Sequence, residues 1–235
     1  MPFAYLCDFD GTVSPQDIGA ALVHRFSAGR EPERDALLAR WAGGALGHRE
    51  LSIAECALLE VNEADALAFT RTFRLDRQFA PFVREALGRG DAVMIVSEGF
   101  DFYVRDQLAR AGLSDLPRAA NEARFEGGRV TAAFPFADAA CAAGCGNCKA
   151  QHVRRYRGRG FHTVLVGDGL SDRCGARAAD TVLARGALGA WCASERLACV
   201  PFEDFADVAE FARQRDLAAP LPRPSRPASR AARRS

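Results

Sequence analysis

The chain has 235 residues, 49% of them hydrophobic, which is enough to bury the core of one large domain or of one domain with an insert. The formal charge of +1 is unevenly spread, because residues 220–235 carry five arginines and no acid and leave a net −4 on the rest. A slightly acidic body argues against nucleic acid as a partner, since phosphate backbones need a concentrated basic face, but it allows a small anionic ligand.

No stretch of the sequence is typical of a signal peptide or of a membrane span. The first apolar run is brief and is interrupted by Asp8 and Asp10, so we expect a cytoplasmic protein with no membrane partner. Eight cysteines are scattered along the chain apart from one cluster, and without an export signal they indicate thiols or a metal site rather than a disulfide framework. The sequence does not indicate an oligomeric state.

A short apolar run, Phe3 to Cys7, opens the chain and is typical of a buried parallel strand. Asp8 and Asp10 follow it two positions apart, so their carboxylates project to the same side. The next residues, Gly11 and Thr12, let backbone amides turn toward an anion. This arrangement suits a cation and a phosphate, with Asp8 as nucleophile and Asp10 as acid and base. The alternative is a strand that simply ends in a turn.

The following segment, 14–78, is predicted to be helical throughout. The run Ser14-Pro15-Gln16-Asp17 has the pattern of a capping box with proline at the first helical position. Three more helices are expected, the last capped by Asn62: Glu31–Trp41, His48–Val61 and Glu63–Phe73. We expect 14–78 to form a small cap over a site on the first strand, with an ordinary helical part of the core as the alternative.

Strands and helices alternate after residue 78. Helices are expected at Phe79–Leu87, Phe102–Ala111, Lys149–Arg157, Ser171–Ala178 and Phe205–Arg213. Strands are expected at Ala92–Val96, Thr163–Val166 and Thr181–Leu183, with a hairpin turn at Gly127-Gly128. The alternation predicts an α/β fold, a Rossmann-like parallel sheet between two layers of helices, built from 1–13 and 79–216. The tail, 217–235, is rich in Pro, Ser, Ala and Arg and is predicted to be disordered.

Two later strands also end in polar residues, and parallel sheets bind ligands at the carboxyl ends of their strands. Ser97 and Gly99 offer a hydroxyl and a flexible backbone that can donate hydrogen bonds to phosphate oxygens. Asp168 and Asp172 follow another strand, four positions apart and so on the same side of a turn into a helix. Each residue alone fits a turn or a helix end, but together they predict one site.

Mg²⁺ prefers one or two protein carboxylates together with phosphate oxygens and water. Asp8, Asp168 and the backbone carbonyl of Asp10 could supply such a set. Asp172 is expected either to bind the ion or to hold its water shell.

Lysine is nearly absent, because the 31 basic residues include one lysine, Lys149, and thirty arginines. A sequence that favours arginine can keep one lysine where a compact ammonium is needed, since the planar guanidinium cannot imitate it. Survival by chance is the alternative explanation.

The order of these residues resembles the four motifs of haloacid dehalogenase superfamily phosphatases: Asp8-Phe9-Asp10-Gly11-Thr12, Ser97-x-Gly99, Lys149 and Gly167-Asp168-Gly169-x-x-Asp172. A helical insert between the first two motifs is similar to the cap of the phosphoserine phosphatase branch. The runs Ser97 to Tyr103, Cys141 to Lys149 and Pro201 to Phe205 are similar to the subgroup with the methionine-salvage 2-hydroxy-3-keto-5-methylthiopentenyl-1-phosphate phosphatases. Phosphocholine/phosphoethanolamine phosphatase is a more distant relative.

The resemblance implies that Asp8 forms an aspartyl-phosphate, and that Asp10 protonates the leaving alcohol and then activates water. It also implies that Mg²⁺ offsets charge between nucleophile and phosphoryl group. A cradle for the phosphoryl group would consist of Gly11, Thr12, Ser97, Gly99 and Lys149. The substrate does not follow from the resemblance, because the cap varies most among such enzymes.

A cysteine cluster, Cys141-x3-Cys145-x2-Cys148, immediately precedes Lys149, and His152 follows. A Cys₃His zinc site would fix the loop that positions Lys149. Packed free thiols are an alternative, and so is a disulfide or redox role. The other cysteines are expected to be core thiols: Cys7, Cys56, Cys174, Cys192 and Cys199.

Three residues are candidates for substrate contact. Asp17 could reach the leaving group from the first helix, or it could only cap that helix. Phe100 and Asp101 follow the Ser97 motif. His24 and His48 could face the substrate, but we expect them at the surface or with a partner in the fold.

We therefore predict a Mg²⁺-dependent phosphatase that acts on a small phosphorylated metabolite, with a methionine-salvage intermediate as the first candidate. A phosphotransferase or phosphomutase would use the same aspartyl-phosphate. A dehalogenase would need neither the phosphate cradle nor proton transfer by Asp10 to an alcohol. Two non-catalytic alternatives are a protein that binds a phosphorylated metabolite and a zinc-clamped interaction protein.

Overall fold

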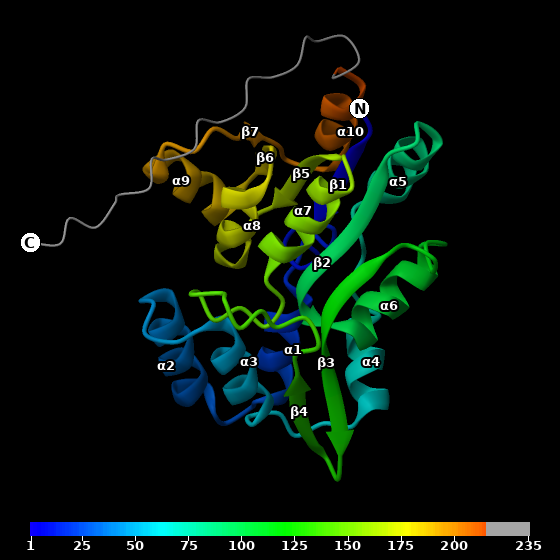
Figure 1. Ribbon diagram of the computed structural model, residues 1–235. Helices are drawn as coiled ribbons and strands as arrows, with labels where there is room; N and C mark the ends of the chain where they lie inside the picture. The colour runs from blue at the N-terminus through cyan, green and yellow to red at the C-terminus, as the bar shows by residue number, and fades with distance from the viewer. Residues whose placement is uncertain (215–235) are drawn as a thin grey trace, which may run out of the picture.

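The computed structural model describes residues 1–214, which form a seven-stranded sheet with helices on both faces (Figure 1). The strands are β1 (Phe3–Cys7), β2 (Ala92–Phe100), β3 (Arg118–Glu126), β4 (Arg129–Ala133), β5 (His162–Gly167), β6 (Thr181–Ala184) and β7 (Val200–Pro201). Their order is β4-β3-β2-β1-β5-β6-β7, with β4 antiparallel to β3 and the other pairs parallel. The predicted α/β fold is confirmed. The predicted disordered tail, 217–235, lies outside the described residues, as do 215 and 216.

Strand β1 is central because its side chains are apolar on both faces. Tyr5 and Cys7 pack in one hydrophobic core with α5 (Phe79–Gly88), α6 (Asp101–Arg110) and α10 (Phe205–Gln214). Ala4 and Leu6 pack in a second core with α7 (Lys149–Gly158), α8 (Arg173–Ala178) and α9 (Gly186–Glu195). A strand covered on both faces is what an apolar run in a parallel sheet predicts.

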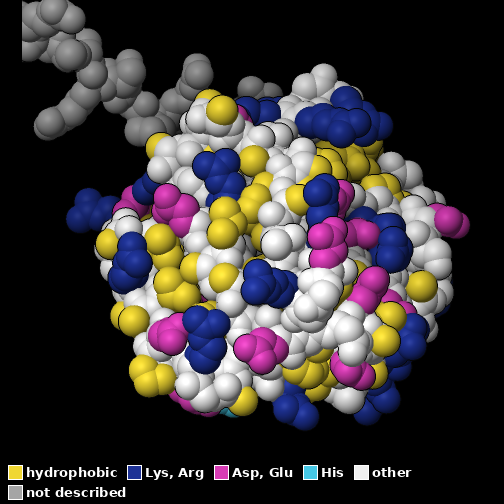
Figure 2. Space-filling view, turned by 90° about the horizontal axis from the view of Figure 1, so that it is seen from below, with side chains coloured by type: hydrophobic (Ala, Val, Ile, Leu, Met, Phe, Trp, Pro, Cys, Tyr) yellow, Lys and Arg dark blue, Asp and Glu magenta, His cyan; other side chains and the backbone are white. Residues whose placement is uncertain are grey.

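The segment 14–78, called the helical insert below, contains α1 (Ile18–Phe26), α2 (Glu31–Ala42), α3 (His48–Cys56) and α4 (Glu63–Thr70). These helices lie at the lower end of the molecule in Figure 1, beside the β3–β4 hairpin. The Val61 amide donates to the Gly128 carbonyl at 3.2 Å, and Glu60 pairs with Arg129. Figure 2 shows that basic and acidic side chains are interspersed on this lower face.

Several predicted boundaries were wrong, and three of them matter for the site. Helix α1 begins at Ile18 with Asp17, not Ser14, as its N-cap, because the Asp17 side chain accepts a hydrogen bond from the Ala20 amide at 2.7 Å. Helix α3 ends at Cys56 instead of Val61, where the chain turns to pair with β4. Strand β2 continues to Phe100 and therefore contains the polar motif that was expected to follow it.

Among residues 1–214, no helix has the combination of length and apolar character that crossing a membrane requires.

Candidate active site

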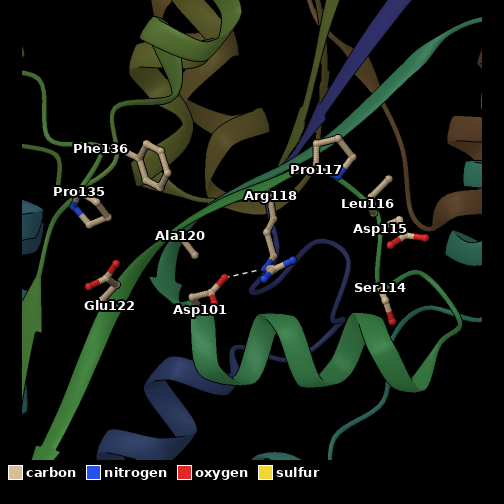
Figure 3. Close-up of a pocket in the computed structure, with 10 residues that line it drawn as sticks. All are labelled: Asp101, Ser114, Asp115, Leu116, Pro117, Arg118, Ala120, Glu122, Pro135 and Phe136. Atoms are coloured by element: carbon tan, nitrogen blue, oxygen red, sulfur yellow. Dashed lines mark hydrogen bonds and ion pairs between the residues drawn. The ribbon is translucent and has the colours of Figure 1, made fainter.

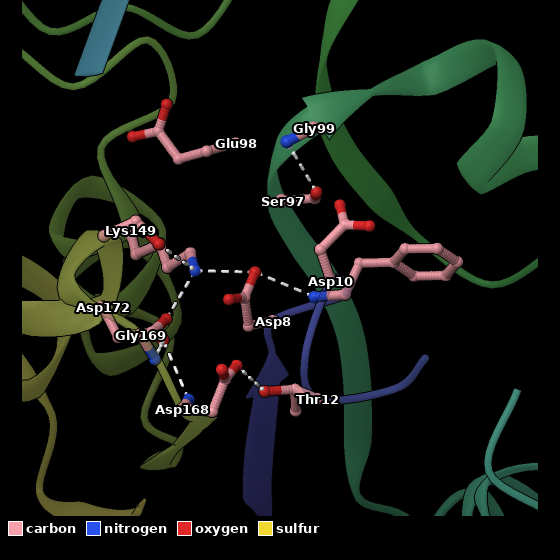
Figure 4. A network of polar contacts seen from close by, with 12 residues as sticks. Asp8, Asp10, Thr12, Ser97, Glu98, Gly99, Lys149, Asp168, Gly169 and Asp172 are labelled. Carbon is pink, nitrogen blue, oxygen red and sulfur yellow. Dashed lines mark hydrogen bonds and ion pairs between the residues drawn. The ribbon is translucent and has the colours of Figure 1, made fainter. Parts of the chain in front are cut away.

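Four charged side chains meet at the carboxyl ends of β1 and β5, and we call Asp8, Lys149, Asp168 and Asp172 the strand-end cluster (Figure 4). Lys149 is the first residue of α7, and its ammonium lies 2.7 Å from Asp8 Oδ1 and contacts Asp172 Oδ1. Asp172 ends the single-turn helix η1 (Leu170–Asp172) after β5. Lys149 and Asp172 are fully buried, so water does not weaken this ion pair.

Burial changes the protonation equilibria of the strand-end cluster. Burial and then the charge of Asp172 raise the pKa of Asp8, while Lys149 opposes the rise. Burial would lower the pKa of Lys149, but attraction to Asp172 and Asp8 holds that pKa above its usual range. Burial also raises the pKa of Asp168. Three acids beside one base leave an excess of negative charge, which a divalent cation would offset.

The carboxylates of the cluster fit a hard metal ion. One oxygen from each of Asp8, Asp168 and Asp172 lies within 4.8 Å of the others. Asp172 is heavily engaged, because Oδ1 contacts Lys149 and Oδ2 accepts the amides of Asp168 and Gly169, both at 3.0 Å. Asp8 and Asp168 are therefore better placed as direct ligands, and Asp172 is better placed to orient them.

Asp10 points its carboxylate between two helices. Its Oδ1 accepts the amides of Ile18 and Gly19 at the start of α1, at 2.9 and 3.3 Å, and its Oδ2 accepts the Tyr103 hydroxyl at 2.7 Å. Burial, with a contribution from the charge of Asp17, raises the pKa of Asp10 to about 7, against the effect of these hydrogen bonds. A carboxyl group that titrates near neutral pH can both donate and accept a proton.

Two glycines leave the space that these carboxylates occupy. Gly11 has φ +75°, and a Cβ there would lie 2.4 Å from Asp168 Oδ2. A Cβ on Gly99 would lie 1.8 Å from the Tyr103 hydroxyl and 2.5 Å from Asp10 Oδ2. Any larger residue at either position must displace an acidic side chain.

Figure 4 shows four of the predicted phosphate-contacting residues around Asp8: Thr12, Ser97, Gly99 and Lys149. Ser97 is fully buried in β2, where the pairing with β3 shifts register, and its Oγ accepts the Gly99 amide at 2.9 Å. The Thr12 hydroxyl donates to Asp168 Oδ1 at 2.7 Å. The amides of Gly11 and Thr12 make long hydrogen bonds of 3.4 and 3.3 Å to nearby carbonyl oxygens.

The candidates for substrate contact lie apart from the strand-end cluster. Phe100 is buried in the core, and Asp17 caps α1. The Asp101 carboxylate accepts a hydrogen bond from Arg118 at 2.7 Å and lines a pocket of about 420 Å³ whose lining contains none of the cluster (Figure 3). The other lining residues include Pro117 and Phe136.

The cysteine cluster has a different fourth member from the one the sequence suggested. Sulfur atoms of Cys141, Cys145, Cys148 and Cys174 lie within 4.8 Å of one another. His152 is not part of this group, and its Nε2 lies 2.7 Å from Asn147 Oδ1. The expectation that Cys174 is a separate core thiol was therefore wrong.

Sequence reasoning missed several residues that hold the site together. Besides Tyr103, these include Glu98, whose Oε2 accepts the Gly146 amide at 3.0 Å. The Asn147 side chain donates to the Ser97 carbonyl at 2.9 Å, and Arg185 Nε donates to the Gly11 carbonyl at 3.1 Å. Tyr103 lies four residues after Gly99, in a run that the sequence analysis had singled out. The residues that Glu98, Asn147 and Arg185 contact are distant in sequence, so no local pattern predicted those contacts.

Comparisons with known proteins agree with this geometry. Residues 5–177 match the haloacid dehalogenase-like hydrolase family. The chain is 32% identical over 213 residues to the 2-hydroxy-3-keto-5-methylthiopentenyl-1-phosphate phosphatase of Brevibacillus brevis, covering 88% of this chain and 94% of that protein. It is 34% identical over 206 residues to the protein of the same name from Geobacillus kaustophilus, covering 86% and 91%.

Solved structures show the same fold. A substrate-bound phosphoserine phosphatase superimposes with a TM-score of 0.68 at 19% identity, over 90% of this chain and 98% of that one. A phospho-aspartyl intermediate analogue of phosphoserine phosphatase gives 0.67 at 20% identity, over 89% and 98%. The fold, the strand-end acids and the sequence match show that the chain belongs to the haloacid dehalogenase-like hydrolase family. Within that family it is a phosphatase, and phosphatases of this kind generally use Mg²⁺.

Proposed function

We propose that this phosphatase hydrolyses a small phosphomonoester in two steps through phosphorylated Asp8. The observation that carries the proposal is the placement of Asp8 Oδ1 2.7 Å from the Lys149 ammonium, with Asp10 held separately by Tyr103 and α1. One carboxylate is thus kept beside a positive charge, and the other titrates near neutral pH. This division suits a nucleophile and an acid/base.

In the first step, an Asp8 oxygen attacks phosphorus while the ester bond to the alcohol breaks, and protonated Asp10 gives its proton to the leaving oxygen. In the second step, Asp10 takes a proton from water, and the water oxygen attacks phosphorus. The bond from Asp8 to phosphorus breaks, which releases inorganic phosphate and restores both carboxyl groups. Lys149 offsets the negative charge of Asp8 and of the phosphoryl oxygens throughout.

The phosphoryl group would be held by Ser97, Gly99 and the Gly11-Thr12 turn. The hydrogen bond of 2.9 Å from the Gly99 amide to Ser97 Oγ supports this proposal, because it makes the two polar groups direct neighbours. The long hydrogen bonds of the Gly11 and Thr12 amides are the kind that a phosphate oxygen would replace.

We propose that Asp8, Asp168 and the Asp10 carbonyl hold Mg²⁺, with Asp172 orienting the set. The excess negative charge of the strand-end cluster and its all-oxygen donors support this choice of ion. Mg²⁺ supplies charge neutralisation between the nucleophile and the transferred group.

The substrate proposal is 2-hydroxy-3-keto-5-methylthiopentenyl-1-phosphate, a methionine-salvage intermediate. It rests on two relatives of that name, each above 30% identity over more than 85% of this chain. We propose that residues 1–13 and 79–216 form the catalytic core and that the helical insert, 14–78, is a cap that selects the substrate. The amides that α1 donates to Asp10 support this role for the insert. A cytoplasmic location fits such a metabolite.

The test compares phosphate release from p-nitrophenyl phosphate and from 2-hydroxy-3-keto-5-methylthiopentenyl-1-phosphate, with Mg²⁺ and after its removal by a chelator. We expect Mg²⁺-dependent turnover of both compounds, with kcat/KM higher for the second. Asp8→Asn should lower kcat by about 10³-fold or more, because the nucleophile is lost. Asp115→Asn, at an exposed acid, is the matched control.

Full activity in Asp8→Asn would remove the nucleophile assignment. Transfer of the phosphoryl group to a second alcohol without release of inorganic phosphate would instead indicate a phosphotransferase. A preference for phosphoserine or phosphocholine would leave the mechanism in place and replace the substrate.

A further inference from the structure

The four clustered thiols have the spacing of a tetrahedral metal site. Their sulfur atoms lie within 4.8 Å of one another, and Cys145 Sγ is 4.0 Å from Cys174 Sγ. Zinc binds thiolates at about 2.3 Å, so the corners of such a tetrahedron are about 3.8 Å apart. A disulfide bond joins two sulfurs at about 2 Å and gives no reason for four to converge.

The cluster joins two segments that are separate in the sequence. Cys141, Cys145 and Cys148 belong to the loop 134–148, and Cys174 lies in the first turn of α8. Cys145 and Cys148 are buried, whereas Cys141 and Cys174 are half-buried, so the group lies close to the surface on the side of the last two. The two-residue gap between Cys145 and Cys148 is common among zinc ligands.

The loop 134–148 contains no helix or strand, and loops of this length without internal structure are uncommon in a packed domain. Its hydrogen bonds to the sheet include those from the Gly146 and Asn147 amides to Glu98 Oε2, at 3.0 and 3.2 Å. A metal ion bound to the thiolates of Cys141 and Cys145 would add a further constraint on this part of the loop.

We propose that Cys141, Cys145, Cys148 and Cys174 bind one structural zinc ion as four thiolates. His152 is not among the proposed ligands because neither of its ring nitrogens belongs to this group of atoms within 4.8 Å of one another. The ion would lie outside the strand-end cluster, and it differs from Mg²⁺ in its preference for sulfur.

The position of the proposed zinc site links it to the strand-end cluster. Cys148 immediately precedes Lys149, and Cys174 follows Asp172 by two residues, so one ion would fix both ends of the Lys149–Asp172 contact. The same loop meets the helical insert, where the Arg49 amide donates to the Gly144 carbonyl at 3.0 Å. This consequence rests on the proposed function, but binding of the ion does not.

The experiment measures zinc in the full-length protein, produced with zinc in the medium and purified without chelators or metal resin. Elemental mass spectrometry should find one zinc per chain. The cobalt-substituted protein should show the strong thiolate-to-cobalt absorption of a tetrahedral sulfur site. Cys174→Ser should lose at least tenfold in zinc affinity, whereas Cys199→Ser, at a half-buried cysteine outside the cluster, should match the wild type.

Hydrogen exchange provides a second measurement that does not depend on catalysis. Removal of zinc should speed amide exchange across 141–150 and leave β1 unchanged. Wild-type protein that contains no zinc, whether its four thiols are free or joined as disulfides, would overturn the proposal. Unchanged zinc affinity in folded Cys174→Ser would overturn the four-thiolate ligand set. A zinc-loaded protein without phosphatase activity would instead count against the proposed function alone.

Discussion

The strand-end cluster and the junction between the sheet and the helical insert both place charged groups in buried surroundings, but they do so differently. In the cluster, Lys149 contacts two carboxylates from neighbouring strand ends and is fully buried. At the junction, His48 of the insert lies 3.2 Å from Glu98 of β2, and its side chain is 21% exposed. The cluster lies within the sheet and the helices that follow its strands, whereas the junction depends on how the insert packs against them.

This difference predicts that substitutions in the two regions have different effects. Parallel strands bring their carboxyl ends to one edge, so the groups that act on phosphorus are positioned by the core. The insert reaches that edge through a few polar contacts, which include Asp10 with the start of α1. A change in the cluster should therefore act mainly on kcat, and a change at the junction should act mainly on stability and on how the insert is held.

Among the changes that compare these two regions, Lys149→Met is expected to have the largest effect. It leaves three carboxylates without their counter-charge and should lower kcat by about 10²-fold or more. Lys149→Arg should not restore activity, because Lys149 is 0% exposed and a planar guanidinium does not fit the space of the ammonium. Steady-state kinetics with Mg²⁺ at saturating substrate measures the loss.

Arg154→Met is the matched control for Lys149, because Arg154 lies on the same helix with a side chain that is 61% exposed. It should keep wild-type kcat. Circular dichroism of each variant separates a lost charge from a lost fold. If Lys149→Met is folded and fully active, the cluster does not carry the chemistry.

An intermediate effect is expected for Tyr103→Phe, which removes one hydrogen bond to Asp10. The hydrogen bond from Tyr103 stabilises the charged form of Asp10 and lowers its pKa, so its loss should raise that pKa from about 7 to a higher value. The acidic limb of the kcat profile, where Asp10 must act as a base, should then move to higher pH. At neutral pH, kcat should fall about fivefold, the equivalent of a net hydrogen bond.

The control for this change is Tyr156→Phe, at a buried tyrosine in the other hydrophobic core. Its pH profile should match that of the wild type. A Tyr103→Phe profile that keeps its acidic limb while kcat falls at every pH would show that Tyr103 acts through packing and not on the protonation of Asp10.

The same contrast explains what could be predicted from sequence. The strand-end residues were predictable because each follows an apolar strand and parallel strands end at a common edge. Tyr103 and Asp10 are 93 positions apart, so their hydrogen bond depends on how α6 packs beside α1. Cys174 was missed because the nearby His152 had a plausible spacing, yet α7 turns that ring toward Asn147.

The helical insert shows more clearly which features could not be predicted from the sequence. Its helices were predictable from apolar spacing, and the expected cap of Asn62 on α4 is present, with its side chain accepting the Asp65 amide at 2.9 Å. Whether Asp17 would reach the substrate or cap α1 could not be decided from sequence, since both roles need the same carboxylate. The pairing of His48 with Glu98 depends on tertiary contact and had no sequence signal.

The smallest expected effect is at that pair. Burial lowers the pKa of His48, but attraction to Glu98 outweighs burial and raises it above 6.5. The pair therefore stabilises the fold fully below pH 6.5, and this contribution is lost as pH rises through the raised pKa. The free energy of unfolding should fall by about 1 kcal/mol over that rise.

His48→Gln should lose this dependence of stability on pH, whereas His24→Gln, at an exposed histidine, should keep it. Urea unfolding at pH values on both sides of 6.5 measures the difference. A wild-type stability that does not change over this range would mean that packing alone holds His48 at the junction.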